Sequence, residues 1–217
     1  MPKTKILIAD DHRVVIEGIK STLREYQEFE VAGEALNGRE AVKLAESLMP
    51  KIVITDISMP DLNGLDTTLQ IKKISSDIRI IIYTMYSDRE FIIDLFKAGI
   101  SAYVLKEDPI SELILAIKAV NGGGTYFSTM APTILLRHIK TLEEGNIEEN
   151  IFKILSLRER EVFQLLAEGN STKNIAHKLC ISPKTVESHK YNIMAKLDLE
   201  SIADLIRLAI RKKIIPL

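Results

Sequence analysis

The residues that decide the fold are 52–56, which read Ile-Val-Ile-Thr-Asp. This apolar run is too short for a typical helix and lacks the alternation of a half-exposed strand, so it predicts a strand buried on both faces of a parallel sheet. Similar runs lie elsewhere in the first half of the chain: Ile6 to Ala9, Ile80 to Tyr83 and Ala102 to Leu105.

Amphipathic segments long enough for helices separate these runs: Val14 to Glu25, Gly38 to Leu48, Arg89 to Ala98 and Ile110 to Val120. The alternation of strands and crossover helices predicts a doubly wound α/β domain with a five-stranded parallel sheet. In such a sheet, the loops that follow the strands gather around one crevice, so residues distant in sequence share a site.

Polar side chains follow several of the predicted strands. Asp10, Asp11 and Asp56 supply three carboxylates, and Thr84 and Lys106 follow later strands. Carboxylates brought this close together need a cation. Hard oxygen donors without cysteine or histidine ligands favour Mg²⁺, which also accepts phosphate oxygens.

Asp56 is the expected nucleophile of this group. A carboxylate attacks phosphorus to form an acyl phosphate when a metal neutralises its repulsion with the incoming phosphoryl group. Lys106 would offer an ammonium to one phosphoryl oxygen, and the Thr84 hydroxyl would donate a hydrogen bond to another. The added charge would reorganise a nearby loop, so we expect the product to be a signal.

The order of these residues closely resembles the receiver domain of two-component response regulators, which is a flavodoxin-like domain. The resemblance covers about the first 120 residues and rests on Asp10-Asp11, the stretch Asp56 to Gly64, Thr84, Tyr103 and Lys106. It implies that Asp56 is the phosphoacceptor for a sensor histidine kinase.

The resemblance also implies the ligands of Mg²⁺ beside Asp56. Asp11 would bind the ion directly, Asp10 would help through bound water, and the main-chain carbonyl of Ser58 would complete the protein ligands.

Thr84 and Tyr103 match the switch pair of the family, in which the hydroxyl moves towards the phosphate and the ring turns inward. Two neighbours depart from the family pattern. Glu107 stands where many receivers have proline after a cis bond, and a cis bond without proline costs about 3 kcal/mol, so we expect a different local backbone. Met85 replaces a small residue, which predicts slower phosphoryl entry or hydrolysis.

The composition indicates two domains and no membrane partner. A chain of 217 residues with 46% apolar content exceeds one small domain, and none of its stretches approaches a membrane span. The first five residues lead straight into a predicted strand, which argues against a signal peptide. The single cysteine, Cys180, excludes an internal disulfide and fits a reducing cytoplasm.

Charge is divided unevenly along the chain. Residues 1–150 carry 17 Lys and Arg against 23 Asp and Glu, whereas residues 151–217 carry 12 against 7. A basic excess in the last part is typical of nucleic-acid binding.

Glycines at Gly122 to Gly124 and the acidic stretch Glu143 to Glu149 predict a linker over residues 123–152. The linker separates a receiver domain at 1–122 from a last domain at 153–217. Its apolar residues fit one amphipathic linker helix: Ile134, Leu135, Leu136 and Ile139.

The last domain contains four helix starts, each with serine at the N-cap: Ser156, Ser171, Ser182 and Ser201. Glu159 completes a capping box with the first, and proline follows the third, so a small all-α domain of four helices is predicted. In the third helix, Val186, Ile193 and Leu197 form a core face and leave a polar face opposite.

This domain looks like the LuxR-type helix-turn-helix. The matching segments are Leu155 to Val162, Ala167 to Gly169, Ile175-Ala176 and Ser182 to His189. Together with the receiver motifs, they identify the chain as similar to the NarL/FixJ class of transcriptional response regulators. The third helix is then the recognition helix for the major groove of promoter DNA.

Two groups of contacts are predicted on this helix. Glu187, Ser188 and Tyr191 are candidates for base edges, since serine pairs with several bases and glutamate accepts from cytosine N4. The other polar side chains are expected to contact phosphates: Lys184, Thr185, His189, Lys190, Asn192 and Lys196.

The final helix resembles the dimerisation helix of the family. Its apolar residues at helical spacing are Ile202, Leu205, Ile206 and Ala209. Phosphorylation is therefore expected to favour a homodimer that reads two half-sites.

Other functions compete with this interpretation. A phosphatase using Asp56 would need a second acid, and Ser58 stands two residues on, so slow self-dephosphorylation is the most that we expect. A dinucleotide-binding fold is disfavoured because Gly122 to Gly124 do not follow the first strand. A DNA-binding protein whose receiver works without phosphorylation stays open as an alternative.

The remaining histidines and the cysteine receive structural interpretations. His12, His138 and His177 show no metal-like grouping and are expected at the surface or packed against helices. Cys180 stands at the end of an apolar helix face, so burial is expected.

Overall fold

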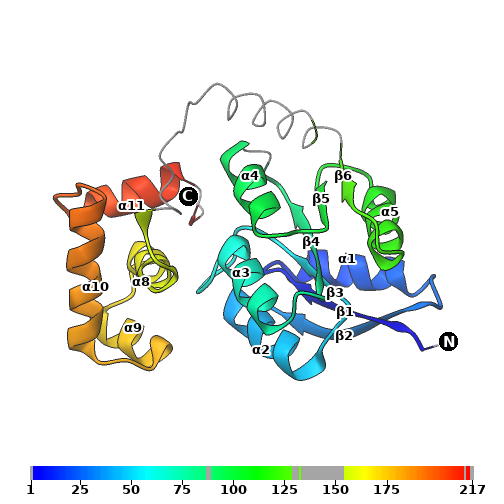
Figure 1. Cartoon of the computed structure of the whole chain (residues 1–217), viewed down its shortest axis with the longest axis horizontal. Helices are drawn as coiled ribbons and strands as arrows, with labels where there is room; N and C mark the ends of the chain where they lie inside the picture. Colours follow the sequence, from blue (N-terminus) through cyan, green and yellow to red (C-terminus); the bar gives the residue numbers. More distant parts are fainter. Residues whose placement is uncertain (1, 87–88, 129–131, 133–153, 213, 216–217) are drawn as a thin grey trace. The chain divides into compact units, whose positions relative to one another are not determined.

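The computed structural model (Figure 1) describes residues 2–86, 89–128, 132, 154–212 and 214–215. Internal contacts divide the chain into two compact units, one formed mainly by residues 1–147 and the other mainly by residues 148–217. Each unit has its own hydrophobic core.

The first unit is built on one six-stranded parallel sheet in the order β2-β1-β3-β4-β5-β6. Its strands are β1 (Thr4–Ala9), β2 (Phe29–Ala35), β3 (Ile52–Thr55), β4 (Arg79–Thr84), β5 (Ala102–Leu105) and β6 (Tyr126–Phe127). The doubly wound α/β class predicted from the sequence is confirmed.

Helices cover both faces of this sheet (Figure 1). They are α1 (Arg13–Leu23), α2 (Gly38–Leu48), α3 (Gly64–Ile74), α4 (Arg89–Lys97) and α5 (Ile110–Asn121). α1 and α5 pack on one face, and α2, α3 and α4 lie along the other (Figure 1).

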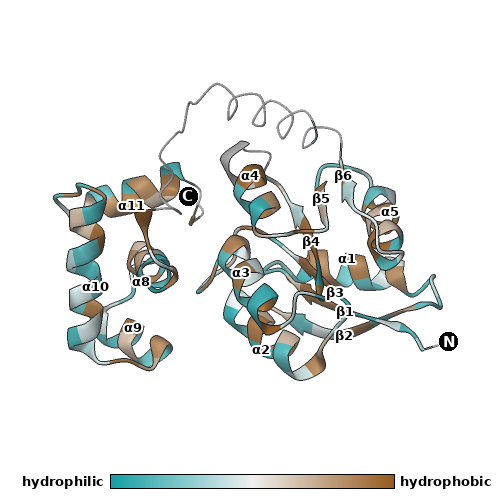
Figure 2. Ribbon diagram, in the orientation of Figure 1, coloured by the Kyte–Doolittle hydropathy of each residue, from teal (hydrophilic) through white to brown (hydrophobic). Residues whose placement is uncertain are grey.

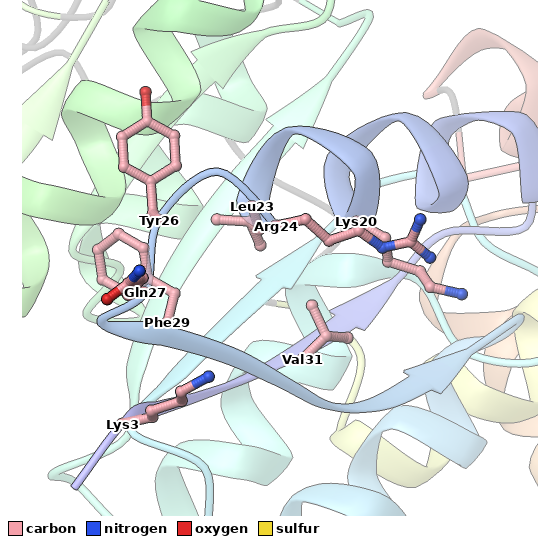
Figure 3. Close-up of a pocket in the computed structure, with 8 residues that line it drawn as sticks. All are labelled: Lys3, Lys20, Leu23, Arg24, Tyr26, Gln27, Phe29 and Val31. Carbon is pink, nitrogen blue, oxygen red and sulfur yellow. The ribbon is translucent and has the colours of Figure 1, made fainter.

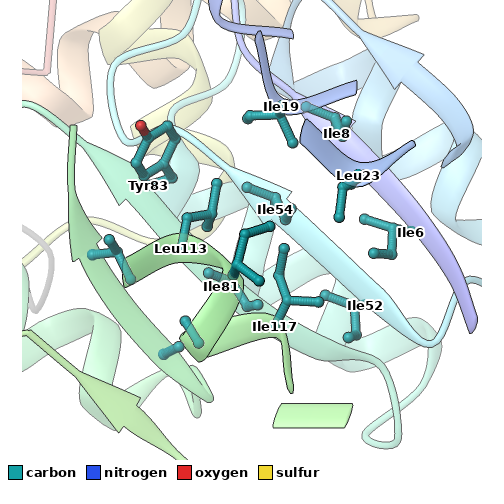
Figure 4. Packing of buried hydrophobic residues seen from close by; sticks show 14 of the residues in the cluster. Ile6, Ile8, Ile19, Leu23, Ile52, Ile54, Ile81, Tyr83, Leu113 and Ile117 are labelled. Atoms are coloured by element: carbon teal, nitrogen blue, oxygen red, sulfur yellow. The ribbon is translucent and has the colours of Figure 1, made fainter. Parts of the chain in front are cut away.

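Alternate strand residues point to opposite helical layers, as the two-residue period of a strand requires. Ile6 and Ile8 of β1 join the core with Ile19 of α1 and Leu113 of α5 (Figure 4). Ala9, the next residue in β1, belongs to a separate small cluster on the side of α2. Burial on both faces explains why the central strands read as continuous apolar runs.

The structure differs from the predicted receiver domain at its last strand. β6 pairs with β5 through Ala102 opposite Tyr126 and Tyr103 opposite Phe127, so the sheet has six strands and not five. Residues 126–127 lie in the segment assigned to the linker, and the receiver unit therefore continues past residue 122. The predicted linker helix at Ile134 to Ile139 falls outside the described residues.

One helix of the first unit, α3, has no counterpart among the amphipathic segments quoted from the sequence. Its start is marked by Asn63, whose side chain accepts a hydrogen bond from the Asp66 main-chain N–H at 2.9 Å. Asparagine is a preferred N-cap, so the stretch Asn63 to Asp66 carried a usable signal.

Four helices lie in the second unit between residues 157 and 211: α8 (Leu157–Ala167), α9 (Thr172–Leu179), α10 (Pro183–Lys196) and α11 (Ile202–Arg211). Every serine N-cap expected from the sequence is confirmed. Ser156 and Glu159 form the predicted capping box, and Pro183 is the first residue of α10.

The core of the second unit draws on all four helices. Val162 of α8, Ile175 of α9, Val186 of α10 and Leu205 of α11 are each fully buried. Val186 and Ile193 were predicted on the core face of α10, and both are buried there.

The backbone of Gly64 packs tightly against the loop that follows β3. Its N–H donates to the Ile57 carbonyl at 2.7 Å, and a Cβ on it would stand 2.1 Å from the Asp56 main-chain oxygen. We expect Gly64→Ala to lower the unfolding free energy of the receiver unit by about 2 kcal/mol, because backbone must shift. Hydrogen exchange of the β1 and β3 amides measures this free energy.

Gly18→Ala is the matched control, because a Cβ at Gly18 in α1 meets no atom within 4 Å. There alanine should raise the same free energy by about 0.5 kcal/mol or more, since glycine disfavours helix interiors. Equal effects of the two substitutions would show that the Gly64 contact is unimportant.

Candidate functional site

Two carboxylates are buried where β1 and β3 end. Asp10 is 2% exposed and Asp56 is 5% exposed. Parallel pairing fixes both backbones, because the Asp10 N–H donates to Ala35 and the Asp56 N–H donates to the Ala9 carbonyl, each at 3.0 Å. The fold thus brings together residues that are 46 positions apart in the sequence.

Lys106, directly after β5, is shared by these two carboxylates. Its Nζ lies 2.6 Å from Asp10 Oδ2 and 2.6 Å from Asp56 Oδ2. Burial disfavours the charged ammonium, but the carboxylates of Asp56 and Asp10 outweigh burial and raise the pKa of Lys106. Burial raises the pKa of the Asp10 carboxyl, and Lys106 opposes that rise. The predicted association of Asp10, Asp56 and Lys106 is present.

His12 also belongs to this cluster, contrary to the expectation of a histidine without metal-like grouping. One ligand atom from each of Asp10, Asp11, His12 and Asp56 lies within 4.8 Å of the others. The His12 Nδ1 is 2.8 Å from Asp11 Oδ1 and 3.3 Å from Asp10 Oδ1. The signal that sequence analysis missed was its position directly after the aspartate pair.

The donor set fits a hard divalent cation. Three carboxylates and the His12 imidazole converge, with no thiolate in the cluster, and the predominance of carboxylate oxygens suits Mg²⁺. Asp56 Oδ1 accepts a hydrogen bond from the Ile57 N–H at 2.6 Å, which fixes the orientation of the carboxylate. Ser58 is half-buried in the same loop.

Thr84 and Tyr103 are connected through the backbone of Tyr86. The Tyr86 N–H donates to Thr84 Oγ1 at 3.4 Å, and the Tyr103 hydroxyl donates to the Tyr86 carbonyl oxygen. Tyr103 is 1% exposed, so its ring is turned inward in this structure. The sequence indicated the two side chains but not the main chain that joins them.

The two departures from the receiver pattern have structural counterparts. No cis peptide bond occurs in the part of the chain that the structure describes, so the Lys106–Glu107 bond is trans, as expected. The Lys106 N–H still donates to the Thr84 carbonyl at 2.8 Å and remains anchored to β4. Met85 is 56% exposed beside the buried Thr84.

A separate pocket of about 280 Å³ lies near the amino ends of β1 and β2 (Figure 3). Its apolar lining is Leu23, Phe29 and Val31, and its cations are Lys3, Lys20 and Arg24. The lining holds no carboxylate or thiol to accept a phosphoryl group. The cluster at the opposite, carboxyl edge of the sheet is therefore the candidate for phosphoryl chemistry.

In the second unit, α10 presents a mostly hydrophilic surface (Figure 2). Of the predicted base-reading residues, Glu187 and Ser188 are exposed, and Tyr191 is 76% exposed. His189 and Lys190 are half-buried. The other predicted phosphate contacts are exposed: Lys184, Thr185, Asn192 and Lys196.

Two of these side chains are already engaged within the unit. Glu187 Oε1 accepts a hydrogen bond from the Thr172 hydroxyl at 2.7 Å. The Lys196 Nζ lies 2.7 Å from Glu159 Oε2, in the capping box of α8. Burial would raise the pKa of Glu159, but the bonds from Lys196 and Ser156 lower it overall. Lys196 thus holds α10 against α8 and is a weaker phosphate candidate than Lys184.

The predicted dimerisation residues divide into two groups. Leu205 and Ala209 are fully buried in the core of their own unit, and Ile202 packs against that core. The expectation that Leu205 and Ala209 face a partner is therefore wrong, because a residue inside the core has no surface to offer. Ile206 is partly exposed and lies outside the core cluster.

Cys180 is exposed and not buried as expected. It ends α9 in the left-handed conformation, with φ of 53°.

Family models match both units. Residues 6–118 match the response regulator receiver domain, and residues 153–209 match the luxR family of bacterial regulatory proteins. The chain belongs to the NarL/FixJ class of DNA-binding transcriptional response regulators. Membership in this class confirms the predicted two-component regulator.

Known relatives match the chain over nearly its whole length. The oxygen regulatory protein NreC of Staphylococcus epidermidis is 39% identical over 215 residues, which cover 97% of this chain and 99% of that protein. The RcsB response regulator of Salmonella typhimurium is 27% identical with a TM-score of 0.63, and all of both chains is covered. A structure of two RcsB dimers bound to DNA is 28% identical with a TM-score of 0.58, covering 94% of this chain and 96% of that chain.

Among the described residues, the helices are too short or too polar to span a bilayer.

Removing Lys106 should show how much the carboxylates depend on it. Lys106→Met leaves Asp10 and Asp56 without their shared cation, and loss of one partner from a buried ionic cluster costs about 3 kcal/mol. We expect the unfolding free energy of the receiver unit, from hydrogen exchange in Mg²⁺-free buffer, to fall by that amount. Lys43→Met, on the exposed face of α2, should change it by less than about 0.5 kcal/mol. Similar effects of the two substitutions would refute the shared pairing.

Proposed function

We propose that Asp56 accepts a phosphoryl group from a sensor histidine kinase and that this step controls dimerisation and promoter binding. The observation that carries the proposal is the placement of one ammonium, Lys106 Nζ, 2.6 Å from a carboxylate oxygen of both Asp10 and Asp56. An ammonium at the nucleophile is in place to bind a phosphoryl oxygen once it arrives.

Asp10, Asp11 and Asp56, together with the Ser58 carbonyl, would hold Mg²⁺. A bound Mg²⁺ supplies positive charge that offsets the repulsion between the carboxylates and the phosphoryl oxygens. The Nδ1 of His12, 2.8 Å from Asp11 Oδ1, helps to orient the Asp11 carboxylate beside this position.

In the transfer step, an Asp56 carboxylate oxygen forms a bond to phosphorus while the bond between phosphorus and the donor nitrogen breaks. The histidine of the kinase keeps the electron pair and returns to the neutral imidazole after proton uptake. The Ile57 N–H holds Asp56 Oδ1, so the carboxylate does not rotate freely during attack. Lys106 moves from pairing with two carboxylates to pairing with the phosphoryl group.

The link through Tyr86 gives this step a route to the surface. The Thr84 hydroxyl now accepts a hydrogen bond from the Tyr86 N–H at 3.4 Å. If the hydroxyl turns towards the phosphoryl group, this hydrogen bond is lost. The Tyr86 carbonyl, which accepts the Tyr103 hydroxyl, moves with the same peptide chain. We therefore expect phosphorylation to move the main chain at Tyr86, next to the buried Tyr103 ring.

The same cluster does not suit turnover of free substrates. Ser58 stands where a second acid would be needed to protonate a leaving group, so we expect at most slow self-dephosphorylation. Exposed Met85 stands beside Thr84 and is expected to slow water entry further.

We further propose that α10 enters the major groove of promoter DNA and that a homodimer reads two half-sites. The support is the polar, exposed surface of α10 and the similarity to RcsB, whose dimers bind DNA. Because Leu205 is buried, the partly exposed Ile206 of α11 is the better candidate for an apolar contact between the two chains of the dimer. The protein is expected to act in the cytoplasm.

A second candidate is a DNA-binding protein whose receiver dimerises or binds partners without phosphorylation. The inward position of Tyr103 in the unmodified chain favours it, because that is the ring position expected after switching.

Acceptance of phosphate is tested by intact mass. The wild-type chain incubated with acetyl phosphate and Mg²⁺ should gain a phosphate adduct under conditions that preserve acyl phosphates, and Asp56→Asn should gain none. Asp77→Asn, an exposed carboxylate outside the cluster, is the control and should behave as the wild type. An equal adduct on Asp56→Asn would show that another residue is the acceptor.

Phosphate contact by α10 is tested by salt dependence. Lys184→Ala should weaken binding to all DNA duplexes alike and reduce the slope of log affinity against log salt by about 1. Lys196→Ala should change the slope less, because its ammonium is paired with Glu159. Fluorescence anisotropy over a salt series measures both slopes, and equal slopes in the two variants would reject this distinction.

A further inference from the structure

A hydrogen bond joins α9 to α10 in the second unit. The Thr172 hydroxyl, on the first residue of α9, donates to Glu187 Oε1 on α10 at 2.7 Å. The Lys190 Nζ is 3.9 Å from Glu187 Oε2. The carboxylate is therefore restrained on one oxygen and faces a cation on the other, although the side chain is 56% exposed.

The helices that carry this pair are themselves fixed. Ile175 of α9 and Val186 of α10 are fully buried in the same core. Ile175 lies one turn after Thr172, and Val186 directly precedes Glu187. Ser182 caps α10 by accepting the Thr185 N–H at 3.0 Å. Thr172 is half-buried at the start of α9.

A carboxylate on a helix that enters DNA is an unusual group, because phosphates repel it. It contributes when it is held towards a base edge, where it accepts from an exocyclic amino group such as cytosine N4. A carboxylate cannot hydrogen-bond to guanine O6 and N7 or to thymine O4, because these atoms are also acceptors. A free glutamate loses rotamer freedom when it binds, and a restrained one has lost it beforehand.

We propose that Thr172 is a positioning residue for sequence reading: it holds Glu187 as an acceptor for a cytosine amino group in the major groove. Lys190 balances the carboxylate charge from the other side. The inference rests on the proposed docking of α10 and adds a named partner and base class to it.

The test is selection from a pool of random DNA duplexes by the full-length chain treated with acetyl phosphate and Mg²⁺, followed by sequencing, for wild type, Thr172→Val, Thr172→Ser and Glu187→Ala. Wild type should prefer cytosine at one position of each half-site, and Glu187→Ala should lose that preference. Thr172→Val should reduce the ratio of cytosine to other bases there by about fivefold to tenfold, within the range of a good base contact. Thr172→Ser keeps the hydroxyl and should restore the ratio.

Two controls separate positioning from general damage. Thr172→Val should keep the salt slope and the affinity for unselected DNA, and circular dichroism should show an unchanged helical spectrum. If valine disturbs the helices, Thr172→Ala removes the same hydroxyl with a smaller side chain. Thr172→Ser then remains the variant that restores the hydroxyl.

The outcomes are distinguishable. A Thr172→Val profile identical to wild type, with Glu187→Ala altered, overturns the positioning role and leaves base reading by Glu187 intact. An unchanged profile in Glu187→Ala overturns base reading by Glu187 and the inference with it. Absence of any selected motif in the wild type would instead contradict the proposed docking of α10.

Discussion

One lysine offsets two buried carboxylates, and the receiver unit is arranged around that pairing. Lys106 Nζ is 2.6 Å from both Asp10 and Asp56, and both aspartates are almost fully buried. Charges in such a place are stable only when they are paired. The parallel sheet supplies the pairing by ending β1, β3 and β5 at one edge. An added phosphoryl group would upset this balance, which is why we propose that the cluster responds to phosphorylation.

Hydrogen bonds and ion pairs also organise each unit internally. In the first unit, the Tyr86 main chain joins the Thr84 hydroxyl to the Tyr103 hydroxyl. On the other unit, α10 is held by the pairs Lys196–Glu159 and Thr172–Glu187. Lys184 and Tyr191 of the same helix are exposed.

Local signals were enough to predict much of this structure. Buried strands read as apolar runs, and serine caps mark each helix of the second unit, because both patterns depend on neighbours in sequence. β6 has two residues and forms only by pairing with β5, so its signal was too short to find. The placement of His12 in the acidic cluster and of Leu205 in a core depends on tertiary packing. The Thr172–Glu187 hydrogen bond joins two helices, and no regular spacing in the sequence predicts such a contact.

The central claim is that phosphorylation of Asp56 controls DNA binding. The most direct test measures the affinity of the full-length chain for a selected DNA duplex, before and after treatment with acetyl phosphate and Mg²⁺. The account predicts that treatment tightens wild-type binding by about tenfold, a typical size for coupling between two sites, and leaves Asp56→Asn unchanged. Equal affinity of the phosphorylated and unmodified wild-type chain would contradict the account and favour a receiver that works without phosphorylation.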